Sequence, residues 1–406
     1  MPIVTPTIDG QTPDDVVTPE SASDVATLLA TAAERGLAVA PVGSGTALAL
    51  GNPPERLDLA LSTARLTGIL DYEPSDLVLS VGAGARLGDV QAVLAEHGQT
   101  LPLDPPAADE ATIGGLVATA LSGPMRLSAG TLRDLLIGIS VAHPSGTVTK
   151  AGGMVVKNVT GFDLPRLYHG ALGTLGVVTS ANFKVLPLPR ADATVLRPTD
   201  SLADALAATA AIRSSRIQPV ALEVAWLDAA WLVAVRIAGR EETVRTLTAE
   251  ASALVGGETE TLQRADSAAW WKHYIAAQAL TVSDGEVLLR CSVRPRATGE
   301  LAGHLVTAAS DLEADVTYLA ASVGLGSVIV RLRFAEPGGD ANRLAALQLR
   351  MLGLADYAVI LAAPPAWKTG LDVWGRPPET LDLMRALKAQ FDPGRVLNPG
   401  RFAGRI

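Results

Sequence analysis

The sequence predicts an α+β fold with at least two domains, and two observations support this. Up to about residue 190, short apolar strands alternate with short helices, and then Pro187 and Pro189 interrupt the pattern. From residue 191 to about 365 the composition is rich in Ala, Leu and Val, with helices and alternating strands of its own. The 406 residues are enough for two or three domains with a sizeable core.

The first domain begins with a strongly signalled helix. Ser21 or Ser23 can cap it and Gly36 stops it, so the helix is predicted over 21–36. A second helix is predicted over 87–97, and 122–130 is predicted as loop. Strands are predicted over 37–42, 56–60, 66–72, 77–81, 135–141 and 147–150, and a last one runs to about Leu186.

Composition excludes several classes of protein. The net charge is -9 with no Lys/Arg block, which argues against nucleic acid or an anionic membrane as the main partner. Cys291 is the only cysteine, so neither a disulfide framework nor a thiolate metal cluster can form within the chain. The N-terminus is unlike a signal peptide, and no uninterrupted apolar run is long enough to span a bilayer. The expected compartment is the cytoplasm.

A glycine loop, PVGSGT at 41–46, is the first feature with chemical meaning. Gly43 and Gly45 allow successive N–H groups to turn toward one concavity, and Ser44 and Thr46 add hydroxyl donors. The next residues include two prolines and a glycine, so no long helix opens here as it would in a P-loop or a Rossmann turn. The loop is either a phosphate site of another kind or an ordinary tight turn.

A second glycine pair lies at the start of a predicted helix. Thr112 is a good N-cap for a helix that begins at Ile113, yet Gly114 and Gly115 weaken its first turn. A bare helix N-terminus suits a pyrophosphate. Close packing of the helix on a sheet would explain the same glycines, and both interpretations stay open here.

Four motifs in this order are PVGSGT, ATIGGLVAT, KNVTGFDLPRL and GALGTLGVVTSANFKVLPLP. Together they resemble the FAD-binding domain of the vanillyl-alcohol-oxidase/PCMH superfamily, and more closely the FAD-binding subunit of bacterial glycolate oxidases. The ending DPGRVLNPGR at 392–401 is similar to the family's C-terminal signature. The resemblance covers about residues 18–190 and the last fifteen or so, with a weaker match around 288–293.

The resemblance implies a PCMH-type FAD-binding domain of two α+β subdomains over 1–190, with FAD between them. It also implies an α/β cap domain over 191–365, which selects the substrate, and a segment over 366–406 that packs back on the FAD domain. Many relatives attach FAD through a histidine in the first loop or a cysteine in the second segment. This chain has neither, since the histidine nearest to the loop is His97, so FAD is expected to bind non-covalently.

The resemblance also implies cofactor contacts. The pyrophosphate is expected on one cradle formed by Val42, Gly43, Ser44, Gly45 and Thr46. The second subdomain is expected to line it with Gly114, Gly115 and Ala118, and Pro105 belongs to the same set. The remaining expected contacts are Gly123 and Gly130 beside the flavin or ribityl chain, Val178 through its backbone, and Asn398 near the ring system.

Oxidation of a 2-hydroxy acid needs a cation for the carboxylate, usually arginine, and a base for the hydroxyl proton, usually histidine. The five histidines show no H-x-H spacing, so no metal site is expected. Arg290, in the 288–293 segment, is the candidate for the carboxylate or the flavin ring, with an exposed strand-edge arginine as the alternative. Arg331 and Arg333 alternate with apolar residues and are expected on a solvated face.

Two further clusters have open interpretations. Lys157, Asn158 and Asp163 lie in one of the resembling motifs and are either part of the flavin site or an interface, or a polar loop. The aromatic run Trp270–Tyr274 favours core packing or a partner surface over a pocket lining.

Three functions remain in view. The first is an FAD-binding subunit of a glycolate oxidase complex, which oxidises glycolate to glyoxylate beside a sibling flavoprotein subunit and passes electrons to an iron–sulfur subunit. The second is a free-standing FAD dehydrogenase or oxidase of a small alcohol or 2-hydroxy acid. The third is a non-catalytic assembly subunit. A complex could also hold the chain at the periphery of the inner membrane through its partners.

Overall fold

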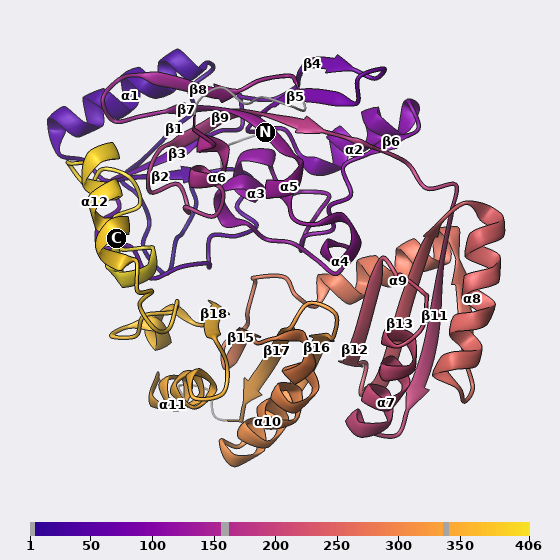
Figure 1. Ribbon diagram of the computed structural model, residues 1–406. Helices are drawn as coiled ribbons and strands as arrows, with labels where there is room; N and C mark the ends of the chain where they lie inside the picture. The colour runs from indigo at the N-terminus through magenta and orange to yellow at the C-terminus, as the bar shows by residue number, and fades with distance from the viewer. Residues whose placement is uncertain (1–4, 156–161, 336–340) are drawn as a thin grey trace. The chain divides into compact units, whose positions relative to one another are not determined.

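The computed structural model describes residues 5–155, 162–335 and 341–406, so Lys157 and Asn158 lie outside the described residues. The chain divides into two compact units (Figure 1). Unit 1 comprises Met1–Leu121, Thr131–Leu188 and Lys368–Ile406. Unit 2 comprises Ser122–Gly130 and Pro189–Trp367.

The first sheet of unit 1 is parallel, in the order β1-β3-β2, and its strands are β1 (Asp15–Val17), β2 (Val39–Val42) and β3 (Leu59–Ser62). Helix α1 (Ala22–Arg35) lies between β1 and β2 in the chain. Ser21 caps it by accepting a hydrogen bond from the N–H of Asp24, and Gly36 ends it in the left-handed conformation. The helix predicted over 21–36 is therefore confirmed, together with its two terminal signals.

The C-terminal segment extends this sheet. The N–H of Val39 donates to the carbonyl oxygen of Val396 at 2.7 Å, and the N–H of Asn398 donates back to the carbonyl oxygen of Val39 at 3.0 Å. Helix α12 (Leu381–Phe391) precedes this pairing, and its Lys388 forms a buried ion pair with Asp392 at 2.6 Å. Residues at the two ends of the chain therefore share one core.

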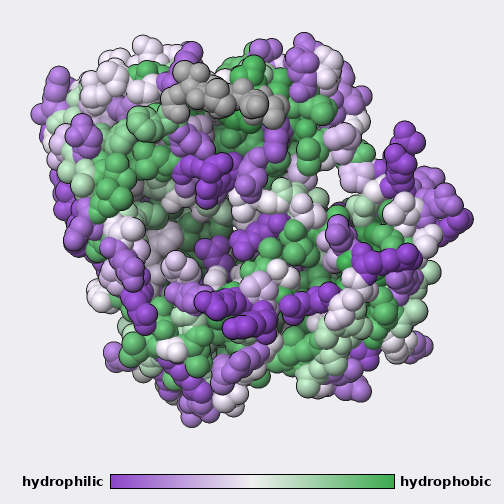
Figure 2. Space-filling view, viewed as in Figure 1, coloured by the Kyte–Doolittle hydropathy of each residue, from purple (hydrophilic) through white to green (hydrophobic). Residues whose placement is uncertain are grey.

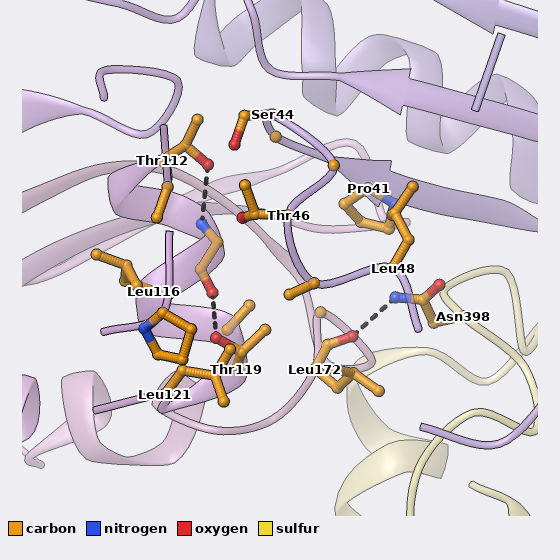
Figure 3. Close-up of a pocket in the computed structure, with 18 of the residues that line it drawn as sticks. Pro41, Ser44, Thr46, Leu48, Thr112, Leu116, Thr119, Leu121, Leu172 and Asn398 are labelled. Atoms are coloured by element: carbon orange, nitrogen blue, oxygen red, sulfur yellow. Dashed lines mark hydrogen bonds between the residues drawn. The ribbon is translucent and has the colours of Figure 1, made fainter. Parts of the chain in front are cut away.

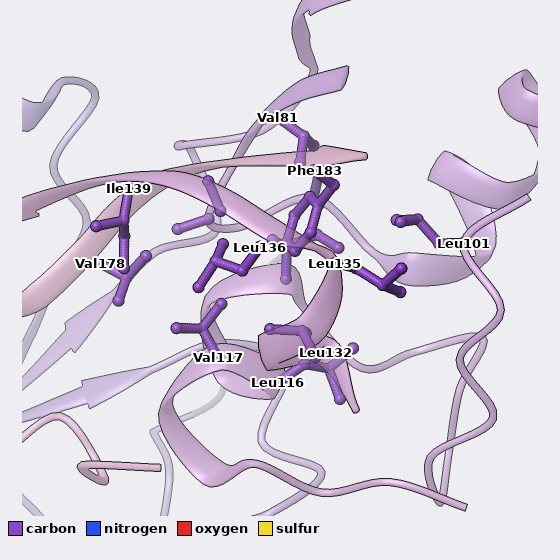
Figure 4. Packing of buried hydrophobic residues seen from close by; sticks show 14 of the residues in the cluster. Val81, Leu101, Leu116, Val117, Leu132, Leu135, Leu136, Ile139, Val178 and Phe183 are labelled. Atoms are coloured by element: carbon purple, nitrogen blue, oxygen red, sulfur yellow. The ribbon is translucent and has the colours of Figure 1, made fainter. Parts of the chain in front are cut away.

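The second sheet of unit 1 is antiparallel, in the order β4-β5-β9-β7-β8. Its strands are β4 (Ile69–Glu73), β5 (Val78–Gly82), β7 (Leu136–Ala142), β8 (Val148–Gly152) and β9 (Val177–Lys184). The helices around it are α2 (Leu87–Glu96), α3 (Ile113–Thr119), α5 (Leu132–Leu135) and α6 (Leu164–Tyr168), and β6 (Gln99–Thr100) pairs with β10 (Leu186–Pro187). Leu116 and Val117 of α3 pack under Ile139, Val178 and Phe183 of the sheet (Figure 4). Burial of each such side chain stabilises the fold by roughly 1.5–3 kcal/mol, and this packing fixes α3 on the sheet.

Unit 2 is built on one eight-stranded antiparallel sheet in the order β14-β11-β13-β12-β16-β17-β15-β18. Its first half is β11 (Ala191–Thr199), α7 (Leu202–Arg213), β12 (Ala221–Leu227), β13 (Ala230–Gly239), α8 (Glu241–Val255) and β14 (Glu260–Gln263). Its second half is β15 (Glu286–Ser292), α10 (Thr298–Asp311), β16 (Ala314–Ser322), β17 (Ser327–Phe334), α11 (Ala341–Leu352) and β18 (Tyr357–Ala362). Both halves have the order β-α-β-β-α-β and meet where β12 pairs with β16. The sequence did not reveal this duplication.

The helix between the halves, α9 (Arg264–Ala276), packs on the sheet through Trp271 and Tyr274, which are buried. The aromatic run is therefore core, as the favoured interpretation held. Arg331 was predicted on a solvated face, and this is wrong. Its guanidinium donates to the carbonyl oxygens of Ala277, Ala279 and Thr281, at and just beyond the end of α9, where free carbonyls attract a cation.

Segment 122–130 was predicted as loop, and this is wrong in part because it contains α4 (Arg126–Ala129). The short helix forms after Pro124, and the hydroxyl of Ser128 donates to the carbonyl oxygen of Val220 at 3.4 Å. Tertiary contact of this kind is invisible in a local pattern. Within the described ranges there are also three single-turn 3₁₀ helices, η1 (Pro295–Ala297), η2 (Pro365–Lys368) and η3 (Ala403–Arg405).

Across the described ranges, no helix is both long enough and apolar enough to cross a membrane. On the face shown in Figure 2, hydrophilic residues are spread among the hydrophobic ones.

Candidate functional site

Gly43 lies in the walls of three cavities formed by described residues of unit 1, of about 80, 50 and 350 Å³. The 80 Å³ cavity is bounded by the 43–48 loop, by α3 and by the C-terminal segment (Figure 3). Figure 3 shows Ser44, Thr46 and Leu48 on one wall, Thr112, Leu116 and Thr119 on another, and Asn398 with Leu172 on a third.

The glycine loop presents open hydrogen-bond donors to this cavity. The N–H groups and hydroxyls of Ser44 and Thr46, and the N–H of Gly45, donate to no atom of the described residues. Gly43 cannot be replaced without displacement, because a Cβ built on it would lie 2.1 Å from Oγ1 of Thr112. Unpaired backbone donors beside a narrow glycine are what a pyrophosphate requires. The residues present therefore fit the diphosphate part of FAD.

The N-terminus of α3 does not offer such donors. The N–H of Ile113 donates to the carbonyl oxygen of Ala85, and the N–H of Gly114 donates to that of Ala83. Gly115 donates to Oγ1 of Thr112 at 3.3 Å. A Cβ on Gly114 would lie 2.9 Å from Cβ of Ala83, so this glycine is explained by close packing. The idea that a bare helix N-terminus receives the pyrophosphate is corrected, because protein carbonyls and a hydroxyl already accept these bonds.

Asn398 forms the C-terminal wall of the cavity. Its backbone is left-handed, with φ of 44°, and its Nδ2 donates to the carbonyl oxygen of Leu172 at 2.7 Å. Its Oδ1 is buried and has no partner among the described residues. A buried acceptor without a partner is costly, so a ligand donor is its natural complement.

Arg401 is a wall residue that sequence reasoning missed. Its Nη2 donates to the carbonyl oxygens of Leu48 and Leu50, both at 2.6 Å, and fixes the end of the glycine loop. The only indication in the sequence is its place in the motif NPGR, in which Asn398 was the one residue predicted to contact FAD. Lys368 holds the same segment, since its Nζ donates to Asp9 and to the carbonyl oxygen of Ala49.

The other predicted contacts fall into three groups. Val42, Gly114, Ala118 and Val178 line the 50 Å³ cavity, and Gly115 and Ala118 also line the 80 Å³ cavity. Pro105 is buried but lines none of the three cavities, whereas its neighbour Pro106 lines the 80 Å³ cavity. Gly123 and Gly130 belong to unit 2 and line none of the three cavities. Contact of all these residues with FAD stays a prediction.

Arg290 lies on β15, which pairs with β17 on one side and β18 on the other. It is therefore not at a sheet edge, and its guanidinium makes no hydrogen bond or ion pair with a described residue. Burial, with the nearby charge of Arg126, lowers the pKa of Arg290 to about 10. It keeps its positive charge at neutral pH and can bind an anion.

None of the residues lining the three cavities is a histidine. Burial lowers the pKa of His143, whose Nε2 lies 2.8 Å from Oγ1 of Thr149, and burial also lowers the pKa of His169. In the part of the chain that the structure describes, no three His, Cys, Asp or Glu side chains gather in a way that could hold a metal ion.

Comparison with known proteins finds family matches at both ends of unit 1. Residues 13–152 match the family described as FAD binding domain, and residues 374–402 match the family of FAD linked oxidases, C-terminal domain. Glycolate oxidase subunit GlcE of Escherichia coli is 38% identical over 219 residues, which cover 53% of this chain and 59% of that protein. Glycolate oxidase subunit GlcD of Bacillus subtilis is 27% identical over 96% of this chain and 88% of its own length. D-lactate dehydrogenase of Archaeoglobus fulgidus is 32% identical over 51% of this chain and 46% of its own.

Two solved structures share the fold. Alkyldihydroxyacetonephosphate synthase matches 97% of this chain and 78% of its own, with a TM-score of 0.70 and 19% identity. Chitooligosaccharide oxidase matches 97% of this chain and 92% of its own, with a TM-score of 0.70 and 15% identity. The predicted fold class is confirmed, and the family matches confirm FAD as the cofactor.

Proposed function

We propose that this chain is an FAD-dependent oxidoreductase that acts on the CH–OH group of a small 2-hydroxy acid, with glycolate as the substrate and glyoxylate as the product. The observation that carries the proposal is the row of open donors from Ser44 to Thr46 beside the cavity, within the FAD binding domain match. Relatives named glycolate oxidase subunits and D-lactate dehydrogenase support this class of substrate.

In this proposal the loop from Gly43 to Thr46 holds the pyrophosphate, and Asn398 offers Oδ1 to a donor of the flavin. FAD, when bound, would supply the acceptor for the hydride that leaves C2 of the substrate, and the hydroxyl proton would pass to solvent water. Arg401 keeps the loop in place through two carbonyls. Because the first loop has no histidine and the only cysteine is the buried Cys291 on β15, FAD binds non-covalently.

The substrate carboxylate is assigned to Arg290. A charged guanidinium without a protein partner is costly to keep partly buried, and a bound carboxylate removes that cost. The chain has a single cysteine, which is too few for an iron–sulfur cluster, so electrons that leave its FAD must pass to another molecule. We assign this role to an iron–sulfur subunit, beside a sibling flavoprotein subunit.

The test is anaerobic titration of the FAD-loaded chain with glycolate, alone and with its candidate partner subunits, followed by visible absorption. Bleaching of the flavin band only in the presence of the partners supports the complex. Bleaching of the chain alone supports the second candidate, a free-standing dehydrogenase, which the relative named D-lactate dehydrogenase favours. A bound flavin that no 2-hydroxy acid reduces in either preparation contradicts the proposed activity and leaves an assembly subunit.

A further inference from the structure

One face of the unit 2 sheet carries a polar row that the FAD site does not use. Strand pairing places Ser292 opposite Ser327, Ser327 opposite Ser322, and Ser322 opposite Glu223. Arg290 lies two residues before Ser292 on β15 and therefore points to the same face. A positive and a negative side chain thus stand at opposite ends of a floor of three small serines.

The negative end of this row is held firmly. Glu223 is 1% exposed, and its Oε2 accepts hydrogen bonds from the hydroxyl of Tyr274 at 2.8 Å and from Oγ of Ser322 at 2.9 Å. Tyr274 is itself fixed in the core, stacked on Trp270 at 5.2 Å. Glu223 is therefore a buried carboxylate in a fixed position.

A second arginine belongs to this group. Helix α4 packs on β12, and Leu127 lies so close to the β16–β17 turn that a Cβ on Gly324 would be 2.6 Å from its Cδ1. This packing places the helix that carries Arg126 beside β12 and the β16–β17 turn. Burial lowers the pKa of Arg126, and the charge of Glu223 opposes that shift, while Arg126 also acts on the pKa of Arg290. Arg126 therefore lies within electrostatic range of both ends.

The serine floor connects the two ends of the row. Glu223 and Ser292 lie on the first and the last of four adjacent strands, so three strand spacings of about 4.7–4.9 Å place them roughly 14 Å apart. The hydroxyls of Ser292 and Ser327 make no hydrogen bond with a described residue. Arg331 and Arg333, the other arginines on the neighbouring strand β17, form ion pairs with Glu286. Two guanidinium groups and two hydroxyls can therefore donate to one ligand.

We propose that Arg126 and Arg290 bind one carboxylate between them above Ser292 and Ser327, and that Glu223 limits the site to monoanions. The inference rests on the proposed function and extends it to a second arginine and to a charge rule. The charges of Arg126, Arg290 and Glu223 sum to one positive charge, which a ligand with one negative charge would neutralise. A 2-hydroxy monocarboxylate neutralises this charge, whereas a dicarboxylate leaves one unpaired negative charge in a partly buried site.

The test uses two unreactive ligands on the FAD-loaded chain, 2-hydroxyisobutyrate and 2-hydroxy-2-methylmalonate, with affinities measured by calorimetry. Neither has a hydrogen on C2, so binding is measured without oxidation. Arg126→Gln and Arg290→Gln are each expected to weaken binding of the monoanion by about tenfold to a hundredfold, the value of a charge-assisted hydrogen bond. Arg126→Lys, which keeps the charge, is expected to lose less. The exposed Arg216, paired with Glu250, provides the control Arg216→Gln, which is expected to bind as the wild type does.

Glu223→Gln tests the charge rule, because it should shift the preference toward the dicarboxylate by about tenfold or more. The thermal unfolding midpoint of each variant shows that the fold is kept. Wild-type binding by Arg126→Gln would overturn the role of Arg126, and an unchanged preference in Glu223→Gln would overturn the charge rule. Binding that depends on both arginines in a protein whose FAD is never reduced by glycolate would keep the site and reject the proposed activity. Reduction of FAD by glycolate with equal KM in wild type and Arg126→Gln would keep the proposed activity and reject the role of Arg126 in the site.

Discussion

Nδ2 of Asn398 donates a 2.7 Å hydrogen bond to the carbonyl oxygen of Leu172, and this bond joins the C-terminal segment to the loop that precedes β9. Both residues line the same cavity as the glycine loop, although 226 positions separate them in the chain. The cavity that we propose as the cofactor site is therefore lined by four stretches, within 41–48, 106–121, 172–173 and 398–401, and each stretch can be tested separately.

Replacement of Asn398 should weaken FAD binding. Asn398→Gly keeps the left-handed backbone but removes the amide, and we expect FAD affinity to fall about tenfold, the value of one buried hydrogen bond. The free energy of unfolding of Asn398→Ala should be about 1 kcal/mol lower than that of Asn398→Gly, because a φ of 44° is unfavourable for alanine. Quenching of FAD fluorescence by the apoprotein measures the affinity. Equal affinity of Asn398→Gly and the wild type would exclude the amide from the site.

Gly43→Ala should remove FAD binding. The added Cβ would meet Oγ1 of Thr112 at 2.1 Å, so the loop must move away from α3, at a cost of about 1–3 kcal/mol. Gly303→Ala on α10 is the matched control, since a Cβ there meets nothing within 4 Å and helix propensity predicts a gain of about 0.5–1 kcal/mol. Thermal unfolding and the flavin content after gel filtration are measured for both. Full flavin content in Gly43→Ala would show that the loop is an ordinary turn.

Arg401→Gln should loosen the glycine loop. The substitution removes charged hydrogen bonds to the carbonyl oxygens of Leu48 and Leu50, and we expect a loss of about 2–4 kcal/mol in unfolding free energy. FAD affinity should fall as well, since the open donors lose their fixed geometry. Arg216→Gln, which loses only an exposed ion pair, is expected to change stability by less than about 1 kcal/mol. If FAD affinity is unchanged in Arg401→Gln, the arginine serves the fold alone.

Glu286 should make unit 2 sensitive to acid. Burial opposes its ionisation, yet hydrogen bonds from Ser283 and the charge of Arg333 lower the pKa of Glu286 from 4.5 to about 2. Because the folded-state pKa is the lower one, the stabilisation is complete above pH 4.5 and is lost as the pH falls toward 2. The loss is expected to be about 3 kcal/mol. Glu286→Gln should be less stable at pH 7 and should show a smaller decline over this window in urea unfolding. Parallel declines in both proteins would contradict the assignment.

Local signals predicted the parts of the fold that depend on neighbours in sequence. Ser21 and Gly36 bound α1 correctly, and Thr112 caps α3 as expected. The glycine loop was found because its composition permits few other conformations. The N–H donors of this loop are open in the structure, and contact of its residues with FAD stays a prediction.

Long-range contacts explain what the sequence could not predict. Arg331 alternates with apolar residues like a surface residue, but the carbonyls that bind it come from the end of α9, about fifty residues earlier. Arg126 lay in a predicted loop, and only the docking of α4 on β12 brings it to Glu223. The bonds that Ile113 and Gly114 donate to Ala85 and Ala83 likewise depend on tertiary packing.

The most direct test of the central claim is the visible absorption spectrum of the purified chain, with FAD added where needed, before and after acid precipitation. We predict a flavin band at one FAD per chain that moves entirely to the supernatant after acid treatment, because no covalent bond holds the cofactor. A chain that shows no flavin band even with added FAD would contradict the cofactor site and the oxidoreductase proposal. A flavin that stays with the precipitate would contradict non-covalent binding.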